Sequence, residues 1–489
     1  MKVLFVIPTA FALEPLGVML LTAICKRHGH TTSLAILSKS DLVRRVAEFE
    51  PDVVAYSATS ADAPVFKTAD DRLRTAMRQS GRRVFRIMGG PYPTFTPSVI
   101  DELELDAICQ GEGDHAMPEL LRRLEAGESI EGIPNIALTS AGAPLKELVQ
   151  DLDAQPIPDR DEYYRVVPYY RISGMRSLIT GRGCPYNCTY CFNQAFNDMF
   201  RGCGPILRRR SVENVLEEIE YMGRHYPPMR LVRFTDDTFA HGVDPWLEEF
   251  CEKYPRRIGL PFYCLMRSNT LTEDTARLLK QAGCHAVSMS IESGSEAIRN
   301  GILGRSLTDE RVRESFAIAK RYGLRTFAST MLAIPGTSLK EDFESLEFVR
   351  RLKPTAPLFP IWTPYRGTQM WQQAVDAGLL DTGADVANWF NGASALNCYT
   401  PEEKNTQLRI CFVGPLYVNA PRFLQPLLLR LIKSRIPIGL MLPPLAIYVT
   451  YRISTRIFPQ GIPRSPSGLF HMIVETVKYM ATRGEAQKP

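Results

Sequence analysis

Short apolar runs alternate with amphipathic stretches along the first 126 residues. The spacing of the apolar positions predicts helices over Leu16–His28, Val65–Gln79 and His115–Glu125. Five β-rich runs predict strands: Lys2–Ile7, Thr31–Leu37, Asp52–Ser57, Arg83–Met88 and Asp106–Gln110. Strands that alternate with helices indicate a doubly wound parallel sheet, which binds ligands at the carboxyl ends of its strands.

The loops that follow four of these strands are rich in glycine and proline. They are Pro8–Gly17, Ser57–Pro64, Gly89–Pro93 and Gly111–Asp114. Ordinary turns use the same residue types. Their recurrence after successive strands favours loops whose backbone comes close to a flat or bulky ligand.

A second alternating series runs from Arg176 to about Thr363. Its predicted strands are Arg176–Thr180, Arg230–Thr235, Pro261–Met266, Ala286–Ile291, Arg325–Ile334 and Ala356–Trp362. Its predicted helices are Val212–Tyr226, Pro245–Tyr254, Glu273–Gly283, Asp309–Gly323 and Leu339–Leu352. Six such repeats fit a partial (βα)6 barrel, with a site at the carboxyl ends of the strands.

The chain therefore divides into four predicted parts of an α/β protein. Residues 1–130 form a Rossmann-like domain and residues 176–368 form the partial barrel. A proline-rich linker, 131–175, joins them, and 369–489 form a mostly helical region in which substrate choice is expected to lie.

Composition adds a compartment and a charge asymmetry. The 489 residues contain 11 cysteines, which is too sparse for a disulfide scaffold, so a reducing cytoplasm is expected. The run Val3–Ile7 is followed by Pro8 without a cleavage site, which indicates a first strand and not a signal peptide. The formal net charge is +5, but residues 421–489 alone carry ten basic and two acidic residues.

This basic C-terminal region also holds an uncharged stretch, Ile436–Tyr451, between Arg435 and Arg452. It is too short to span a membrane and is interrupted by prolines. Three roles stay open: packing on the barrel, contact with an anionic membrane surface, and a lid over a lipid-like substrate. No nucleic-acid recognition motif appears in the sequence.

The strongest chemical signal is the C-x3-C-x2-C motif of Cys184, Cys188 and Cys191, directly after the first barrel strand. Three thiolates can hold three irons of a [4Fe–4S] cluster and leave the fourth iron open for a substrate. Zinc competes, but a structural zinc site needs a fourth nitrogen or sulfur ligand, and no histidine or second C-x2-C motif lies nearby.

With this motif the barrel resembles the radical S-adenosylmethionine (SAM) superfamily. The resemblance implies that the open iron binds SAM and that its reductive cleavage gives a 5′-deoxyadenosyl radical. Carboxylates at strand ends can accept from the SAM ammonium or ribose, and an arginine can pair with its carboxylate. The implied SAM-binding residues are Tyr190, Phe192, Asn193, Asp236, Asp237, Glu292, Ser293, Arg305, Pro335 and Gly336.

A flavodoxin-like sheet ahead of such a barrel is similar to the cobalamin-binding radical SAM proteins, called class B when they methylate. Tyr92 stands where many relatives carry histidine, and the first loop lacks the D-x-H-x-x-G segment that supplies a cobalt ligand. The implied cobalamin-facing residues are Glu14, Pro15, Leu16, Gly17, Ser57, Ala58, Thr59, Ser60, Gly89, Gly90, Pro91, Tyr92, Pro93, Gly111, Glu112 and Gly113.

The resemblance implies methylation of an unactivated carbon through methylcobalamin and the 5′-deoxyadenosyl radical, with no residue named as a general base. It also implies a small-molecule or lipid-like substrate and an external electron donor of flavodoxin or ferredoxin type. Two alternatives stay open. One is an anaerobic cobalamin-dependent cyclase or oxygen-inserting enzyme of tetrapyrrole type, and the other is a non-catalytic corrinoid carrier or sensor.

Overall fold

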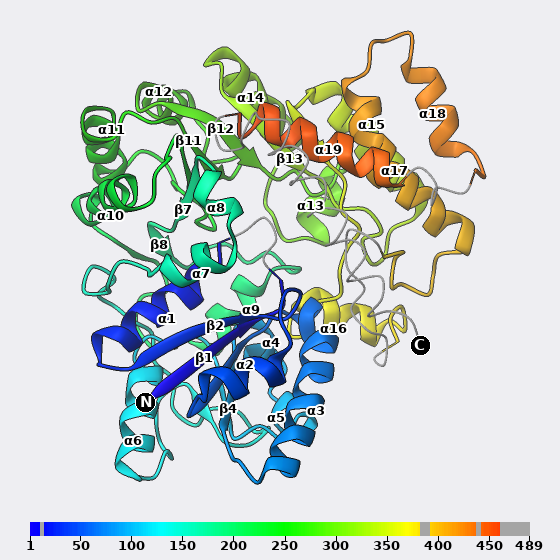
Figure 1. Cartoon of the computed structure of the whole chain (residues 1–489). Helices are drawn as coiled ribbons and strands as arrows, with labels where there is room; N and C mark the ends of the chain where they lie inside the picture. The colour runs from blue at the N-terminus through cyan, green and yellow to red at the C-terminus, as the bar shows by residue number, and fades with distance from the viewer. Residues whose placement is uncertain (10–13, 382–391, 437–441, 460–489) are drawn as a thin grey trace. The chain divides into compact units, whose positions relative to one another are not determined.

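The computed structural model describes residues 1–9, 14–381, 392–436 and 442–459 (Figure 1). These residues form two compact units. Unit 1 comprises Met1–Tyr170 and Ala195–Arg208, and unit 2 comprises Arg171–Gln194 and the described residues from Arg209 onward.

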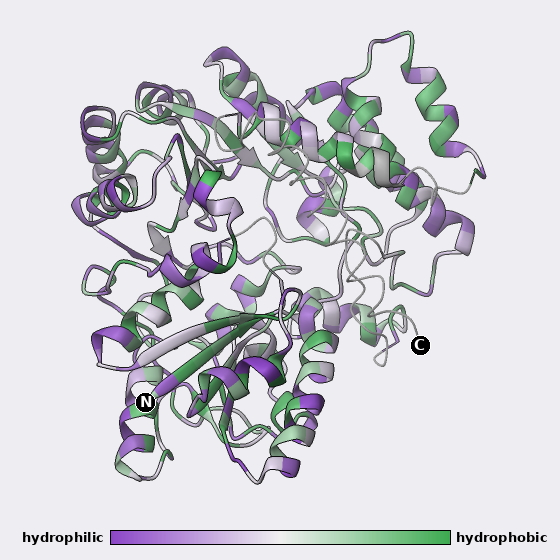
Figure 2. Ribbon diagram, in the orientation of Figure 1, coloured by the Kyte–Doolittle hydropathy of each residue, from purple (hydrophilic) through white to green (hydrophobic). Residues whose placement is uncertain are grey.

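Unit 1 is built on a six-stranded sheet of order β2-β1-β3-β4-β5-β6. The strands are β1 (Lys2–Ile7), β2 (Thr31–Ile36), β3 (Val53–Ser57), β4 (Phe85–Gly89), β5 (Ala107–Cys109) and β6 (Ile136–Ala137). The first five are parallel and β6 is antiparallel to β5. Figure 2 shows the central strand β1 as mostly hydrophobic, as a strand covered on both faces requires. The order 2-1-3-4-5 confirms the predicted flavodoxin-like sheet.

The helices of unit 1 include all three that the periodicity predicted. Up to residue 126 the helical elements are α1 (Leu16–Arg27), α2 (Leu42–Phe49), the 3-10 turn η1 (Ser60–Asp62), α3 (Ala63–Ser80), α4 (Pro91–Phe95), α5 (Val99–Glu102) and α6 (Ala116–Ala126). The three predicted ones are α1, α3 and α6. The sequence did not predict α2, because this short helix buries only Leu42 and Val46. Asp41 caps it by accepting the N–H of Arg44 at 3.0 Å.

The segment predicted as a linker is packed and partly regular. It contributes β6, α7 (Asp161–Val166) and α8 (Tyr169–Ile172). Tyr163, Tyr164 and Tyr170 are buried, and the rings of the last two stack with their centres 5.3 Å apart. Buried aromatic area of this kind holds a proline-rich segment in one place without long strands or helices.

Unit 2 contains a parallel sheet whose six strands follow chain order from one edge to the other (Figure 1). They are β7 (Met175–Leu178), β10 (Leu231–Phe234), β11 (Phe262–Met266), β12 (Cys284–Met289), β13 (Arg325–Ser329) and β14 (Ala356–Leu358). The short strands β8 (Gly181–Arg182) and β9 (Arg208–Arg209) lie outside both large sheets. A sequential order without closure confirms the predicted partial (βα)6 barrel.

Most of the helices between these strands start at a side-chain cap. The helices between the barrel strands are α9 (Phe192–Met199), α10 (Val212–His225), α11 (Pro245–Arg257), α12 (Glu273–Gln281), α13 (Glu296–Gly301), α14 (Asp309–Arg321) and α15 (Leu339–Leu352). Ser211, Asp244, Thr272, Ser295, Thr308 and Ser338 cap α10 to α15 in turn. Each cap accepts a backbone N–H of the first helical turn, which fixes where the helix begins.

The C-terminal region is helical, as predicted, with α16 (Gln369–Asp376), α17 (Pro401–Asn419), α18 (Gln425–Lys433) and α19 (Leu442–Arg456). At the end of α19, Ile457 is fully buried against Tyr263, Ala286 and Ala356 of the barrel strands. Of the uncharged stretch, residues 437–441 lie outside the described residues, and the helix that follows them packs on the barrel. None of the described helices combines the length and the apolar character needed to cross a membrane.

Candidate active site

The three cysteines of the C-x3-C-x2-C motif lie in one loop beyond the carboxyl end of β7. All three are free thiols; Cys184 and Cys188 are buried and Cys191 is partly buried. Thr189 anchors the loop, because its N–H donates to the carbonyl of Leu303 at 3.2 Å and its hydroxyl to that of Ile302 at 2.8 Å.

A glycine permits this close approach. Gly304 has φ +62°, and a Cβ at this position would lie 3.0 Å from the carbonyl oxygen of Asn187 in the cysteine loop. A larger residue would therefore push the loop away from the end of α13.

The thiols interact electrostatically with one another and with the carboxylate of Asp237. Burial raises the pKa of the Cys184 thiol and raises that of Cys191 to about 12, so both are protonated until a metal ion replaces the proton. Among the described residues, no three His, Cys, Asp or Glu side chains are placed to hold a single metal ion. In a [4Fe–4S] cluster each thiolate binds a different iron, so this donor set fits a cluster better than mononuclear zinc.

A second group of predicted residues meets beside the loop. Nη1 of Arg305 donates to the hydroxyl of Tyr190 at 2.6 Å and lies 3.3 Å from Oε1 of Glu292. The Tyr190 hydroxyl also donates to Glu292 at 3.2 Å, and Nη2 of Arg305 donates to the carbonyl of Ser290 at 2.9 Å. Burial raises the pKa of Glu292 and raises that of Tyr190 well above its usual value, while the Arg305 cation opposes both shifts.

Two buried polar atoms of the predicted SAM set have no hydrogen-bond partner among the described residues: Nε of Arg305 and Oδ2 of Asp236. The other carboxylate oxygen of Asp236 accepts the N–H groups of Thr180 and Gly181 at 2.8 and 2.9 Å and the Thr180 hydroxyl at 2.7 Å. Burial raises the pKa of Asp236 to about 6. An unsatisfied donor and acceptor near the cysteines suit a polar ligand such as SAM.

Asp237, the next residue, faces the cysteines themselves. Its carboxylate is hydrogen-bonded to the side chain of Asn193, and burial raises its pKa. Two predicted residues are thus brought together, Asn193 from the first turn of α9 and Asp237 from the loop after β10.

The loop after β13 carries Pro335 and Gly336, and α15 holds it. The buried carboxylate of Asp342 accepts the N–H of Ala333 at 2.9 Å and, through its other oxygen, the amide of Gln407 in α17 at 2.9 Å. Burial raises the pKa of Asp342 to about 7. Ala333 has φ +54°, so this carboxylate stabilises an uncommon backbone conformation.

Ser293 and Phe192 have different surroundings. Ser293 is buried, and its carbonyl accepts Nη1 of Arg299 at 2.7 Å, which is a structural contact. Phe192 lies against Tyr365, with ring centres 4.9 Å apart. Because the N–H of Met370 also donates to the carbonyl of Thr189 at 2.9 Å, the chain after β14 lies next to the cysteine loop.

Sequence reasoning missed Arg267. It follows β11 directly, is buried, and donates from Nη1 to the sulfur of Cys188 at 3.3 Å. Its place at the carboxyl end of a barrel strand was the available signal, since catalytic side chains of such barrels come from these ends.

In unit 1 the predicted loops after β3 and β4 interlock. The N–H of Ala58 donates to the carbonyl of Gly89 at 2.9 Å, and the N–H of Tyr92 to that of Ala58 at 3.0 Å. Gly90 has φ +96°, and a Cβ there would lie 2.7 Å from the Ala58 oxygen. Ser57 ends β3, Ser60 begins η1, and Pro91 and Pro93 lie in the short helix α4. The glycines therefore form a compact backbone edge, which suits a large flat ligand such as a corrin.

Two predicted cobalamin-facing carboxylates are used inside unit 1. Glu14 is buried, hydrogen-bonds the hydroxyl of Tyr164 and lies 3.7 Å from Nε of Arg160. Glu112 pairs with Arg208 at 2.8 Å and accepts the N–H of Val149 at the same distance.

The remaining predicted residues of this edge lie where strands end or helices begin. Pro15 is the N-terminal cap position of α1, which Leu16 and Gly17 open, and Thr59 caps η1 through Asp62. Gly111, whose N–H donates to the Thr94 hydroxyl at 3.0 Å, and Gly113 follow β5.

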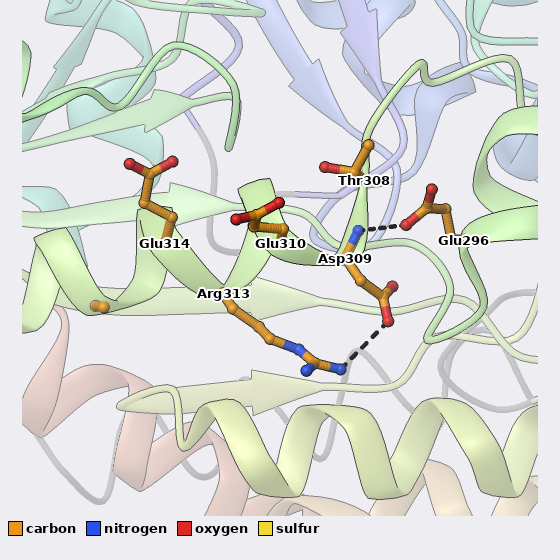
Figure 3. A pocket seen from close by; sticks show the side chains of 7 residues that line it. Glu296, Thr308, Asp309, Glu310, Arg313 and Glu314 are labelled. Carbon is orange, nitrogen blue, oxygen red and sulfur yellow. Dashed lines mark hydrogen bonds and ion pairs between the residues drawn. The ribbon is translucent and has the colours of Figure 1, made fainter.

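A surface pocket of about 700 Å³ lies on α13 and α14, and its lining contains none of the predicted site residues (Figure 3). Glu296 accepts the N–H of Asp309 at 2.6 Å, and Arg313 pairs with Asp309 at 3.3 Å. Glu296 thus adds to the cap that Thr308 provides at the start of α14, and the carboxylate of Asp309 is used in an ion pair.

Comparison with known families decides the identity of both units. The family model described as "Radical SAM superfamily" matches residues 178–349, and the one described as "B12 binding domain" matches residues 3–121. The chain is a cobalamin-binding radical SAM protein. Such a radical SAM enzyme uses a [4Fe–4S] cluster, SAM and cobalamin.

Similar proteins align with this chain along most of their length. This radical SAM enzyme is 28% identical to the uncharacterized methyltransferase PH0819 of Pyrococcus horikoshii over 85% of this chain and 92% of that protein. It is 27% identical to the hopanoid C-3 methylase of Methylococcus capsulatus, over 73% of this chain and 68% of that protein. The solved structure of the radical SAM methyltransferase TsrM of Kitasatospora setae has the same fold, with a TM-score of 0.63 at 19% identity over 83% of this chain and 82% of that one.

Proposed function

We propose that this radical SAM enzyme is a cobalamin-dependent methyltransferase that acts on an unactivated carbon of a small-molecule or lipid-like substrate. The observation that carries the proposal is the Tyr190–Glu292–Arg305 group beside three free cysteines, in a chain that also has a B12-binding sheet. Similarity to two proteins named as a methyltransferase and a methylase supports the same reaction class.

In this proposal Cys184, Cys188 and Cys191 hold the cluster, Arg305 pairs with the SAM carboxylate, and Asp237 and Glu292 accept from its ammonium or ribose. When bound, the cluster and cobalamin supply one-electron cleavage of SAM and transfer of a methyl group. The chain's own contribution is to orient the reactants and exclude water. The proposal assigns no general base.

The loops Glu14–Gly17, Ser57–Ser60, Gly89–Pro93 and Gly111–Gly113 are proposed to hold cobalamin. Their place beyond the carboxyl ends of parallel strands of order 2-1-3-4-5 supports this assignment. Because Glu14 and Glu112 form ion pairs, we propose that these two side chains hold the loops in shape and that the backbone of the loops contacts the corrin.

Anaerobic reconstitution tests the proposal directly. With reductant, SAM and cobalamin, the full chain is expected to form 5′-deoxyadenosine. When a substrate is also present, the product is expected to be heavier than that substrate by one methylene, about +14 in mass. Cys188→Ala is expected to lose iron and both products, whereas Cys251→Ala, at a buried cysteine of α11, keeps them. Loss of hydrogen or gain of oxygen in the product would favour the cyclase-type alternative. Absence of both products from the wild-type chain would refute the proposal.

The proposal includes an external electron donor of flavodoxin or ferredoxin type. Cleavage of SAM needs one electron, and a radical SAM domain receives it through its cluster. A reduced flavodoxin system that replaces dithionite in the same assay should sustain formation of 5′-deoxyadenosine. Failure with both flavodoxin and ferredoxin would exclude this donor class.

We also propose peripheral contact with an anionic membrane through α18. Phe423, in the turn that precedes α18, is 79% exposed, Leu427 of α18 is 62% exposed, and Arg430 follows Leu427 about one turn later. On the opposite face, Ile432 is buried and its carbonyl accepts Nε of Arg409 in α17 at 2.9 Å. Figure 2 shows α18 as mostly hydrophobic. Exposed apolar side chains among arginines suit an anionic bilayer surface.

Vesicle sedimentation checks this contact. The full chain is expected to sediment with vesicles rich in phosphatidylglycerol, and Phe423→Ser with Leu427→Ser to reduce the bound fraction at least roughly tenfold, since each buried apolar side chain contributes more than 1 kcal/mol. Leu145→Ser with Leu207→Ser, at exposed leucines of unit 1, is the matched control. Equal binding by the α18 variant and wild type would refute the contact.

A further inference from the structure

Arg267 is a buried cation whose backbone is held by hydrogen bonds. It is 7% exposed. Its N–H donates to the hydroxyl oxygen of Thr270 at 3.3 Å, and the N–H and hydroxyl of Thr270 both donate to its carbonyl at 2.9 Å. Arg267 is therefore the first residue of a hydrogen-bonded turn after β11, which fixes where its side chain starts.

The contacts of this guanidinium all lead to the cysteine loop or to Arg305. Nη1 donates to the sulfur of Cys188 at 3.3 Å, and Nη2 donates to the carbonyl of Arg305. The guanidinium carbon lies 3.9 Å from the ring centre of Tyr186, which stands between the first two cysteines of the motif. The loop thus holds Arg267 from two sides, through a sulfur and an aromatic face.

The charge of Arg267 lies against sulfur and acts on the carboxylate of Glu292 only from beyond ion-pair distance. Among the described residues, no Asp or Glu lies within ion-pair distance of it, and the nearby Glu292 pairs with Arg305 at 3.3 Å. A buried cation without a counter-ion is costly. Three thiolates around a [4Fe–4S] cluster supply the missing negative charge, which increases by one when the cluster is reduced.

We infer that Arg267 is a positioning residue that raises the reduction potential of the cluster. Its positive charge and its N–H···S hydrogen bond stabilise the reduced cluster more than the oxidised one, because the reduced cluster is the more negative. The buried setting strengthens this effect relative to water. The inference rests on the proposed cluster at Cys184, Cys188 and Cys191.

Anaerobic redox titration of the reconstituted full chain, followed by electron paramagnetic resonance (EPR) of the reduced cluster without SAM, measures the effect. At the wild-type midpoint, Arg267→Met is expected to lower the ratio of reduced to oxidised cluster at least tenfold, which is about 59 mV for one electron. Arg267→Gln keeps an N–H donor, so its midpoint potential should lie between those of wild type and Arg267→Met. Arg267→Lys keeps the charge, so its midpoint potential should stay near that of wild type.

Arg233→Met is the matched control. Arg233 lies on β10 and its guanidinium packs over the rings of Tyr263 and Phe458, at 6.0 and 5.4 Å from their centres. Its replacement removes a similar cation on an aromatic face without a hydrogen bond to a cluster cysteine. The midpoint is expected to remain at the wild-type value.

Iron content distinguishes the failures. A wild-type chain that binds no cluster would refute the proposed function. If wild type and Arg267→Met both bind about four irons and share one midpoint, the role of Arg267 is overturned while the proposed function stands. If both neutral variants lose iron, Arg267→Lys decides: wild-type iron and midpoint support the charge, and loss of iron in all three variants shows a purely steric role and overturns the inference.

Discussion

Glu292 combines three properties that rarely occur together in one residue. It has a left-handed backbone (φ +69°), it is buried, and its carboxylate contacts both Tyr190 and Arg305. Strain and a buried charge pair at one position mark a residue kept for its interactions. The Glu292 carboxylate is oriented by two donors and has capacity to accept from a third, which is the property the proposed SAM contact needs.

Glu292→Gln is expected to weaken SAM binding by roughly 10- to 100-fold, since it leaves Arg305 buried without its carboxylate partner. Tyr190→Phe removes two hydrogen bonds to charged groups, one from Arg305 and one to Glu292, but keeps the Arg305–Glu292 pair, so it should weaken SAM binding less than Glu292→Gln does. Equilibrium dialysis of the reconstituted enzyme with labelled SAM measures both. Glu296→Gln, in the acidic pocket of α13 and α14, is the control, and equal affinities for Glu292→Gln and this control would contradict the assignment.

At the scale of elements, Asp342 joins three of them. It lies near the start of α15 and contacts the loop after β13 through Ala333 and α17 through Gln407. Oε1 of Gln407 is buried without a hydrogen-bond partner among the described residues. A rotated Gln407 amide could therefore accept a hydrogen from a protonated Asp342 or from an asparagine at this position.

Asp342 gives the fold a pH dependence with a definite sign. Its pKa is raised from 3.8 to about 7, so between these values the folded state binds a proton that the unfolded state lacks. Stability is therefore highest below the unfolded pKa and falls as pH rises through about 7, by up to about 4 kcal/mol at ~1.4 kcal/mol per pKa unit.

Asp342→Asn removes this titration and keeps the shape and hydrogen bonds of the side chain. We expect its thermal midpoint to change less than that of wild type between pH 5.5 and pH 8.5, and to exceed wild type at the higher pH. Asp342→Leu loses both hydrogen bonds and should be destabilised at every pH. A wild-type pH slope in Asp342→Asn would show that another group titrates.

At the scale of the whole molecule, the two units offer different kinds of groups to the proposed cofactors. Unit 2 presents thiols, carboxylates and arginines, whereas the loops at the strand ends of unit 1 present mainly backbone and small side chains. The four glycine- and proline-rich loops that contain the predicted cobalamin-facing residues, Pro8–Gly17, Ser57–Pro64, Gly89–Pro93 and Gly111–Asp114, contain no histidine. Cobalt bound there has no imidazole ligand from these loops.

Labelling tests this expectation. The EPR spectrum of Co(II) cobalamin bound to the full chain should be the same whether the protein contains ordinary or ¹⁵N-labelled histidine, because only a bound imidazole nitrogen would change the splitting. The alternative cobalt ligand is His115, which follows the last of these loops. Its Nδ1 lies 2.8 Å from Oε1 of Glu147. A spectrum that changes on labelling and reverts in His115→Ala would contradict the expectation.

Much of this protein was determined by its sequence alone. The five parallel strands of unit 1, the six barrel strands and the longer amphipathic helices were predicted because apolar periodicity of 2 and 3.6 residues is a local property. The cysteine spacing and the loops at strand ends were visible for the same reason. Helix α2 and the helices of 131–175 were missed, because few apolar positions or scattered tyrosines bury them.

Only the tertiary structure decided which predicted residues meet. Tyr190, Glu292 and Arg305 lie far apart along the chain and are joined because parallel strands end at one edge of the barrel. In the structure Glu14 and Glu112 also form ion pairs inside unit 1, and Arg267 donates a hydrogen bond to the sulfur of Cys188. Such pairings depend on long-range packing and on the cost of leaving a buried charge alone, and neither is written in local sequence periodicity.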